Sequence, residues 1–195
     1  MVETRRQQIE DAASALFRER GYPATTVRDI AQRLDIQGAS LYSHVASKED
    51  LLWSIVQRAA GRFEVAADRA AVTAQGLGCL ERMQALVRAH VAVCTDDPRL
   101  ATVFVHEWRF LSPARRAEVL ERRDRYEARF RVLIVEGITC RAFTATDPAL
   151  AATFILTALN GIATWYRPLG RLSAGGIADL YSDLATRMLE GSPAS

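Results

Sequence analysis

The sequence predicts an all-α protein, and three observations support this: its composition, the spacing of its apolar residues and its helix-ending signals. The 195 residues are rich in Ala, Leu, Arg and Glu, which favour helices. Val, Ile, Thr and aromatic residues never gather into alternating runs, so no strand is predicted. With 49% hydrophobic and 25% charged residues, the chain is able to bury a core.

The first helix is predicted from Glu3 to Arg20, because apolar residues recur there at helical spacing. Gly21 is expected to end this helix, and Pro23 prevents it from resuming. The apolar residues that define its buried face are Ile9, Ala12, Ala13, Leu16 and Phe17.

Two short helices are predicted next. Thr26 is expected to cap the first of them, and Asp29 stands three residues on, where a capping box returns the bond. Residues 35–38 form a polar turn, and residues 39–44 form a helix of fewer than two turns. A helix this short is marginal alone, so its neighbours must hold it by packing.

The remaining cap and breaker signals divide the chain into six longer segments. Ser47 opens the first of these, and Asp147 followed by Pro148 opens the fifth. A domain boundary is predicted at the first of these caps, which separates residues 1–47 from residues 48–195. The predicted helices lie at about 48–71, 77–95, 98–110, 113–138, 147–167 and 173–189.

Composition says more about the cell compartment of the protein than about its binding partners. The net charge is +2, and residues 1–50 hold seven basic and eight acidic side chains, or −1, so the position of charges must decide any DNA binding. Cys79, Cys94 and Cys140 are odd in number and form no CxxC pair, which favours a reducing cytosol over a disulfide framework. We expect neither a signal peptide nor an uncharged apolar run of ~18 residues, so a cytoplasmic protein is predicted.

Residues from Thr26 to His44 have the pattern of a helix-turn-helix, braced by the first helix. The second helix of such a motif presents small or polar side chains to a major groove about 12 Å wide. Gly38 and Ala39 permit close backbone approach, whereas Tyr42 and Lys48 reach phosphates. A short helix pair also occurs in bundles that bind no DNA. The predicted DNA-binding residues are Thr26, Arg28, Gln37, Gly38, Ala39, Ser40, Tyr42, His44 and Lys48.

A longer string of residues closely resembles the N-terminal domain of the TetR family, without a gap. The resemblance implies an all-helical homodimer, with three small helices for operator DNA and a larger C-terminal domain for effector binding and dimerisation. Val45 departs from the pattern, where Phe is common. The matching residues are Ile9, Ala12, Ala13, Leu16, Phe17, Gly21, Tyr22, Thr25, Thr26, Val27, Ile30, Ala31, Leu34, Ile36, Ser40, Leu41, Tyr42, His44, Val45, Ser47, Lys48, Glu49, Leu51 and Leu52.

Residues 160–173, NGIATWYRPLGRLS, resemble TetR-type repressors that sense acyl-CoA thioesters in fatty-acid, aromatic-acid or steroid breakdown. The resemblance implies an acyl-CoA effector. From the residue types themselves, aromatic side chains are expected to line an apolar pocket between helices, with Asn160 and Arg167 as polar groups that orient the ligand. The alternative is that the aromatics form ordinary core or interface and Arg167 caps a helix C-terminus. The predicted effector-binding residues are Phe104, Trp108, Phe130, Asn160, Trp165 and Arg167, with Phe110 and Phe154 as further pocket aromatics.

Two other clusters have competing interpretations. The arginines between Arg115 and Arg131 suit CoA phosphates, yet three i,i+4 pairs with Glu favour a solvated helix face. Those pairs are Glu118–Arg122, Glu121–Arg125 and Glu127–Arg131. His90 and Cys94 stand one turn apart, with His106 and Glu107 further on, but no third ligand has a fixed spacing, so no metal or cofactor is predicted.

The family resemblance therefore implies a repressor that leaves a palindromic operator when an effector shifts the spacing of two recognition helices. The resemblance also implies that two apolar stripes, around residues 156–163 and 177–188, pair with a second subunit. No Gly-rich phosphate loop, GxSxG, HExxH or paired-Cys site is found, so an enzyme is not predicted. The alternatives are a TetR-type repressor that senses a hydrophobic drug or a free fatty or aromatic acid, and a helical interaction module without DNA.

Overall fold

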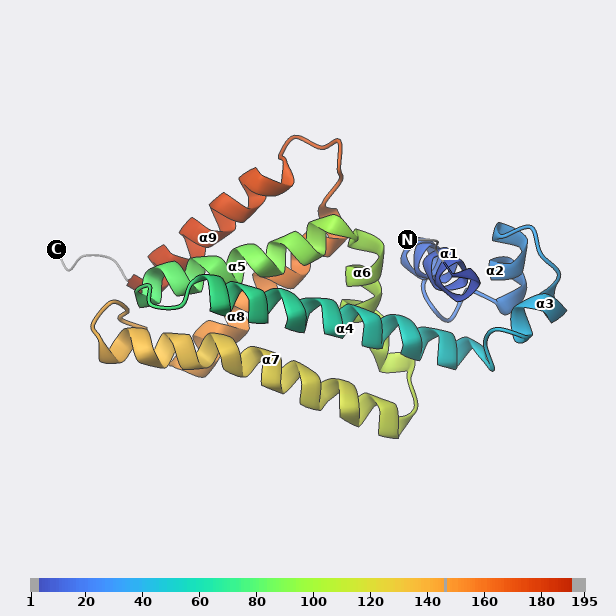
Figure 1. Cartoon of the computed structure of the whole chain (residues 1–195), viewed down its shortest axis with the longest axis horizontal. Helices are drawn as coiled ribbons and strands as arrows, with labels where there is room; N and C mark the ends of the chain where they lie inside the picture. The colour runs from blue at the N-terminus through green and yellow to red at the C-terminus, as the bar shows by residue number, and fades with distance from the viewer. Residues whose placement is uncertain (1–3, 146, 191–195) are drawn as a thin grey trace. The chain divides into compact units, whose positions relative to one another are not determined.

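A computed structural model describes residues 4–145 and 147–190, apart from the side chain of Ala39. Within these residues the protein is all-helical and contains no strand, which confirms the predicted fold class (Figure 1). Glu3, the predicted start of the first helix, lies outside the described residues. The elements are α1 (Arg5–Arg20), α2 (Val27–Arg33), α3 (Gly38–Tyr42), α4 (Lys48–Thr73), α5 (Cys79–Asp96), α6 (Pro98–His106), the 3-10 helix η1 (Trp108–Phe110), α7 (Pro113–Thr139), α8 (Pro148–Trp165) and α9 (Ala174–Glu190).

The chain forms two compact units. Unit 1 combines residues up to Gly61 with Arg99–Leu120, and unit 2 combines Arg62–Pro98 with the residues from Glu121 onward. The long helices α4 and α7 therefore supply residues to both units. The boundary predicted between residues 47 and 48 stays a prediction.

The first helix of unit 1 ends at Arg20, where Gly21 was predicted to end it, and it begins at Arg5. The Thr4 hydroxyl accepts a bond from the Gln7 amide at the start of α1, and Gly21 ends α1 at φ 82°. This left-handed conformation suits glycine and lets the Gly21 amide donate to the Phe17 carbonyl. The core of unit 1 has fully or nearly fully buried Ile9, Leu16, Phe17, Ile30 and Leu41 at its centre.

The predicted capping box at α2 is confirmed. The Asp29 amide donates to the Thr26 hydroxyl over 3.1 Å, and the Thr26 amide donates to the Asp29 carboxylate over 2.7 Å. These bonds from Thr26 lower the pKa of the Asp29 carboxyl. Two otherwise orphaned amides are thus satisfied at the start of a seven-residue helix.

Replacing Thr26 with Ala is expected to lower the free energy of unfolding by about 1 kcal/mol, because α2 loses its cap. Thr26→Ser keeps the hydroxyl and is expected to unfold at nearly the wild-type urea concentration. Equal losses in the two variants, measured by urea unfolding, would assign the effect to the threonine methyl group instead.

The turn between α2 and α3 is closed by bonds within the backbone. Asp35 has φ 53°, the Asp35 amide donates to the Gln32 carbonyl, and the Ile36 amide donates to the Ala31 carbonyl. This is a Schellman motif in which Asp takes the left-handed position that Gly usually occupies. The motif ends α2 sharply and directs the chain into α3.

Acidic residues at the start of α4 tie it to the start of α7 within unit 1. The Ser47 hydroxyl accepts from the Asp50 amide, which confirms the predicted cap. Arg115 binds both Glu49 and Asp50, and the Ser112 amide donates to Glu49 over 3.0 Å. The bond from Ser112, helped by Arg115, lowers the pKa of the Glu49 carboxyl.

In unit 2, α5 packs against α8 and α9 (Figure 1). The α8 cap is confirmed, since the Asp147 carboxylate accepts from two amides and Pro148 follows it. The expected dimer stripes are partly wrong, because Leu159, Ile162 and Ile177 are buried inside the unit. Apolar side chains that face outward on these two helices are Leu150, Phe154, Trp165, Leu180 and Leu184.

The end of α7 is shaped by one glycine. A Cβ on Gly137 would lie 2.0 Å from the Phe143 ring, so only glycine lets Phe143 pack over the helix. The Phe143 amide also donates to the Gly137 carbonyl, and Arg141 turns the chain at φ 63°. This arrangement fixes Cys140, which follows the last residue of α7.

The expectation that no uncharged apolar run reaches membrane-spanning length is wrong. Helix α8 has 18 residues without a charged side chain and a mean hydropathy of 1.3, which is enough to cross a membrane by length and composition. A third of it is buried, and the Leu159 carbonyl lies 3.9 Å from the Cys94 sulfur of α5. A core helix passes the same length test, and α8 contributes to the core of unit 2.

Candidate nucleic-acid interface and ligand cavity

The helix-turn-helix of unit 1 presents an open hollow to solvent. It has a volume of about 800 Å³ and is lined by residues from α2, α3 and the start of α4. Tyr42 is 57% exposed at its edge, and a Cβ on Gly38 would meet no atom within 4 Å. The backbone of α3 can therefore be approached closely there. The lining residues are Thr25, Thr26, Val27, Arg28, Gly38, Tyr42 and Lys48.

In the protein without DNA, the Lys48 side chain is hydrogen-bonded to the backbone of unit 1. Its ammonium donates to the carbonyls of Tyr22 and Thr25 over 2.9 and 2.8 Å and lies 4.2 Å from the centre of the Tyr22 ring. Burial lowers the pKa of this ammonium. An ammonium has three N–H donors, so two carbonyls leave one for a phosphate oxygen.

The other predicted DNA-binding residues are accessible. Gln37, Ser40 and His44 are exposed, as is Arg28. The Thr26 hydroxyl is engaged with Asp29, and the side chain of Ala39 lies outside the described part of the chain. Five of the nine predicted residues line the hollow: Thr26, Arg28, Gly38, Tyr42 and Lys48. Contact with DNA stays a prediction for all nine.

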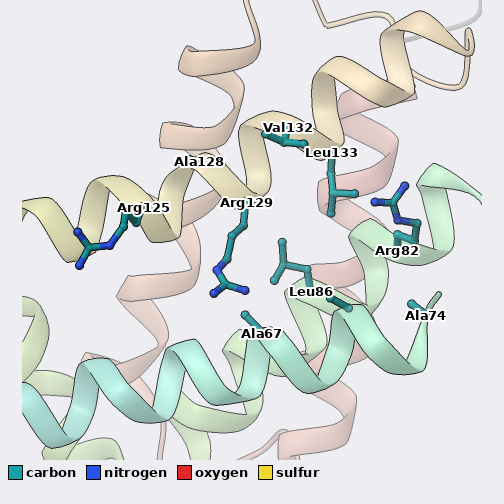
Figure 2. A pocket seen from close by; sticks show the side chains of 10 residues that line it. Ala67, Ala74, Arg82, Leu86, Arg125, Ala128, Arg129, Val132 and Leu133 are labelled. Carbon is teal, nitrogen blue, oxygen red and sulfur yellow. The ribbon is translucent and has the colours of Figure 1, made fainter.

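Unit 2 contains a cavity of about 360 Å³, within the range of small-molecule sites. Figure 2 shows it between α4, α5 and α7, with the Arg129 side chain extending from α7 toward Ala67 on α4. Alanines supply much of its wall, which leaves space where larger side chains would fill it. The lining residues are Ala67, Ala71, Ala74, Arg82, Leu86, Arg125, Ala128, Arg129, Val132 and Leu133.

The three arginines of this cavity already have acidic neighbours. Arg82 lies 2.5 Å from Glu136, Arg129 lies 2.6 Å from Asp68, and Arg125 lies 3.9 Å from Glu121. Such exposed pairs contribute little free energy, so an anionic ligand could displace the carboxylates at low cost.

The arginine-rich stretch is not the fully solvated face that the sequence favoured. The pairs of Arg125 with Glu121 and Arg131 with Glu127 are present, at 3.9 and 4.0 Å. Arg122, however, is largely buried and reaches Glu64 on α4 over 2.6 Å. The reason is that α4 offers acids to one side of α7, which i,i+4 counting within α7 does not reveal.

The six predicted effector residues are not gathered around this cavity. Phe104 and Trp108 belong to unit 1, and the other four belong to unit 2. Phe130 is fully buried, whereas Trp165 is exposed and stacks near Tyr181. The Arg167 guanidinium donates to the carbonyls of residues 164 and 166, which confirms the alternative that it caps α8. Effector contact stays a prediction for all six, Asn160 included.

His90 and Cys94 belong to a buried cluster, as the core interpretation predicted. His90 Nδ1 lies 3.1 Å from the Tyr126 hydroxyl, the Phe63 ring packs at 4.7 Å, and His90 Nε2 has no hydrogen-bond partner. Burial, with Arg123 nearby, lowers the pKa of His90 to about 3. Burial also raises the pKa of Cys94 to about 12. The described residues hold no group of three His, Cys, Asp or Glu side chains placed to share a metal.

Sequence reasoning missed most of the cavity residues. One signal was available, because Ala67, Ala71 and Ala74 follow each other at helical spacing and leave one face of α4 without large side chains. The partner face on α7 was flagged only for its charge, through Arg125 and Arg129. That the two faces line one cavity depends on packing between distant segments.

Comparison with known proteins identifies the family of the chain. Residues 9–55 match the family model "Bacterial regulatory proteins, tetR family", and residues 76–189 match "Tetracyclin repressor-like, C-terminal domain". The HTH-type transcriptional repressor KstR2 of Mycobacterium tuberculosis H37Rv is 31% identical over 92% of this chain and 90% of its own.

Two solved structures extend the likeness to the fold. A bacterial regulatory protein of the tetR family from Rhodococcus RHA1 has a TM-score of 0.87 and 29% identity, over 96% of this chain and 98% of its own. AibR in complex with isovaleryl coenzyme A and operator DNA has a TM-score of 0.82 and 26% identity, over 93% of this chain and 97% of its own. By its two family matches and its relatives along nearly the whole chain, this protein belongs to the TetR family of DNA-binding transcriptional regulators.

Proposed function

We propose that the protein is a homodimeric repressor that binds a palindromic operator and leaves it when an acyl-CoA thioester enters the cavity of unit 2. The observation that carries the proposal is the cavity itself, which combines an apolar wall with three arginines. Because such a repressor acts on chromosomal DNA, we infer that it works in the cytoplasm.

Operator binding is assigned to the hollow around α3. Arg28 and Lys48 supply positive charge beside the exposed Tyr42 and Gly38. In a helix-turn-helix, such residues hold the recognition helix on phosphates while its outward side chains read base edges. One short helix reads few bases, so two copies on successive major grooves are needed for specificity.

The effector class follows from the chemistry of the cavity. Alanine, leucine and valine side chains suit a short acyl chain, and guanidinium groups suit the phosphates of coenzyme A. AibR, at 26% identity, is a structural neighbour whose solved complex contains isovaleryl coenzyme A. A free acid would use one arginine, whereas an uncharged drug would use none.

The dimer contact is assigned to the outward apolar side chains of α8 and α9. Phe154 is 63% exposed and Leu184 is 61% exposed, and Leu150 and Leu180 are also exposed. A monomer that leaves such side chains on two adjacent helices loses the free energy of burying them. Pairing with the same helices of a second subunit would form a four-helix bundle.

Helix α4 supplies residues to both sites and is the proposed relay. Lys48, its first residue, lines the α3 hollow, while Ala67, Ala71 and Ala74 line the cavity. A ligand that fits the cavity better in one position of α4 would shift the population toward that position. The operator and the ligand then weaken each other's binding by the same factor.

The test begins with operator selection from random DNA duplexes and fluorescence anisotropy of the selected site. Isovaleryl-CoA, CoA and isovalerate are then added separately to the protein–DNA complex. Release by the thioester alone supports the proposal. Release by isovalerate, or by a hydrophobic drug and not by the thioester, replaces the effector class and leaves the DNA-binding assignment unchanged.

The cavity is tested by filling it. Ala71→Trp is expected to weaken the response to isovaleryl-CoA at least ~30-fold, because an indole occupies much of the space and removes about 2 kcal/mol of binding. The measurement is the thioester concentration that releases half of the operator. Ala92→Trp is the matched control, since Ala92 is exposed on α5 and does not line the cavity. A wild-type response from Ala71→Trp would show that the effector binds elsewhere.

A further inference from the structure

Two cysteines that are 61 residues apart in the chain meet at one end of unit 2. Cys79 is the first residue of α5, Cys140 follows the last residue of α7, and their sulfur atoms are 3.4 Å apart. Both are free thiols, Cys79 half-buried and Cys140 exposed. A disulfide bond holds its sulfurs about 2.05 Å apart, so oxidation would draw these two atoms closer together.

The surroundings hold this pair in place from both helices. The Cys140 thiol also contacts the Gly137 carbonyl at 3.4 Å, in the turn that Phe143 closes over α7. One helical turn after Cys79 on α5 and one turn before Cys140 on α7, Arg82 binds Glu136 over 2.5 Å. The two sulfurs therefore lie one helical turn from a second contact between α5 and α7.

We propose that Cys79 and Cys140 form an oxidation site at which a hydroperoxide produces an intramolecular disulfide that clamps α5 to α7 beside the cavity. The Cys140 thiolate attacks the peroxide O–O bond, which yields Cys140 sulfenic acid and releases an alcohol or water. The Cys79 thiolate then attacks the sulfenic sulfur, the S–S bond forms, and water leaves. Two thiols and one hydroperoxide thus give one disulfide, one alcohol or water, and one further water.

The order of attack follows from exposure. Cys140 is open to solvent, so an oxidant reaches it first, and the half-buried Cys79 resolves the sulfenic acid from 3.4 Å. Burial and the neighbouring Cys140 raise the pKa of Cys79, which suits it less for the first attack. Cys94 is buried near the Leu159 carbonyl and serves as an internal control thiol.

The disulfide would restrain the side of the cavity that Arg82 lines. Closing a loop of this length reduces the freedom of the unfolded chain, so the melting temperature is expected to rise on the order of 5–10 °C. Hydrogen exchange is expected to slow at the start of α5 and the end of α7. Neither readout depends on the identity of the effector.

The experiment treats the full-length protein with hydrogen peroxide and follows it by intact mass, thiol alkylation and hydrogen exchange. The expected product is a single chain, not cross-linked to a second, that has lost two hydrogens and two alkylatable thiols while Cys94 stays unmodified. Dithiothreitol is expected to restore the reduced protein. Cys79→Ser is expected to accumulate a sulfenic acid at Cys140 that dimedone traps, whereas Cys140→Ser is expected to remain reduced at low peroxide.

Three results would overturn the proposal. The first is oxidation of Cys140 to sulfinic acid with Cys79 still alkylatable, and the second is a disulfide between two chains through Cys140. The third is an intramolecular disulfide that leaves the melting temperature and the exchange at α5 and α7 unchanged.

Discussion

Arg28→Glu is expected to lower operator affinity about 100-fold at 0.15 M salt, or about 2.7 kcal/mol. Arg28 is exposed on α2 at the edge of the α3 hollow, beside Lys48. The substitution removes a phosphate contact and places a carboxylate against the DNA backbone, once in each subunit. Fluorescence anisotropy with the selected operator measures the loss.

The neutral variant separates contact from repulsion. Arg28→Ala is expected to make the dependence of log affinity on log salt less steep by about two, one for each lost phosphate contact in the dimer. Arg171→Glu is the matched control, because Arg171 is exposed between α8 and α9 and carries the same charge. If both charge reversals weaken binding equally, Arg28 acts only through net charge and its assignment to the interface is wrong.

Acidification from pH 7.5 to pH 5 is expected to cost about 2 kcal/mol of folding stability through His90 alone. Burial lowers the pKa of the folded His90 from 6.5 to about 3, whereas His90 in the unfolded chain keeps its ordinary pKa. Between these two values the unfolded chain binds a proton that the folded protein does not bind. Stability therefore falls as the pH falls below 6.5 and is retained above it.

His90→Phe removes this pH dependence while keeping an aromatic ring against Phe63 and Tyr126. At pH 7.5 the variant is expected to be about 1 kcal/mol less stable than the wild type, because the Tyr126 hydroxyl loses its partner. Its stability between pH 7.5 and 5 is expected to fall by about 2 kcal/mol less than that of the wild type. Urea unfolding at one protein concentration measures both, since dimerisation makes stability depend on concentration. Parallel pH profiles would show that His90 is protonated in the folded protein.

The sequence predicted most accurately the helix ends that depend on contacts between residues close together in the chain. Thr26 with Asp29, Gly21 and Asp147 each act on amides or carbonyls within four residues, so the sequence predicted those helix ends correctly. The helix-turn-helix was equally readable, because its caps, turn and buried residues lie within one short segment. The candidate DNA-binding residues follow from that segment.

The contacts between distant segments were decided only by the tertiary structure. The alanine face of α4 lines the same cavity as Ala128 and Arg129 of α7, Arg122 reaches Glu64, and Cys79 meets Cys140. The spacing of residues along a helix indicates which of them share a face. It does not indicate which face of another helix packs against that face. The sequence alone therefore determined the helices and the DNA-binding motif. The cavity, the buried His90 and the thiol pair arise from the packing of helices that lie far apart in the chain.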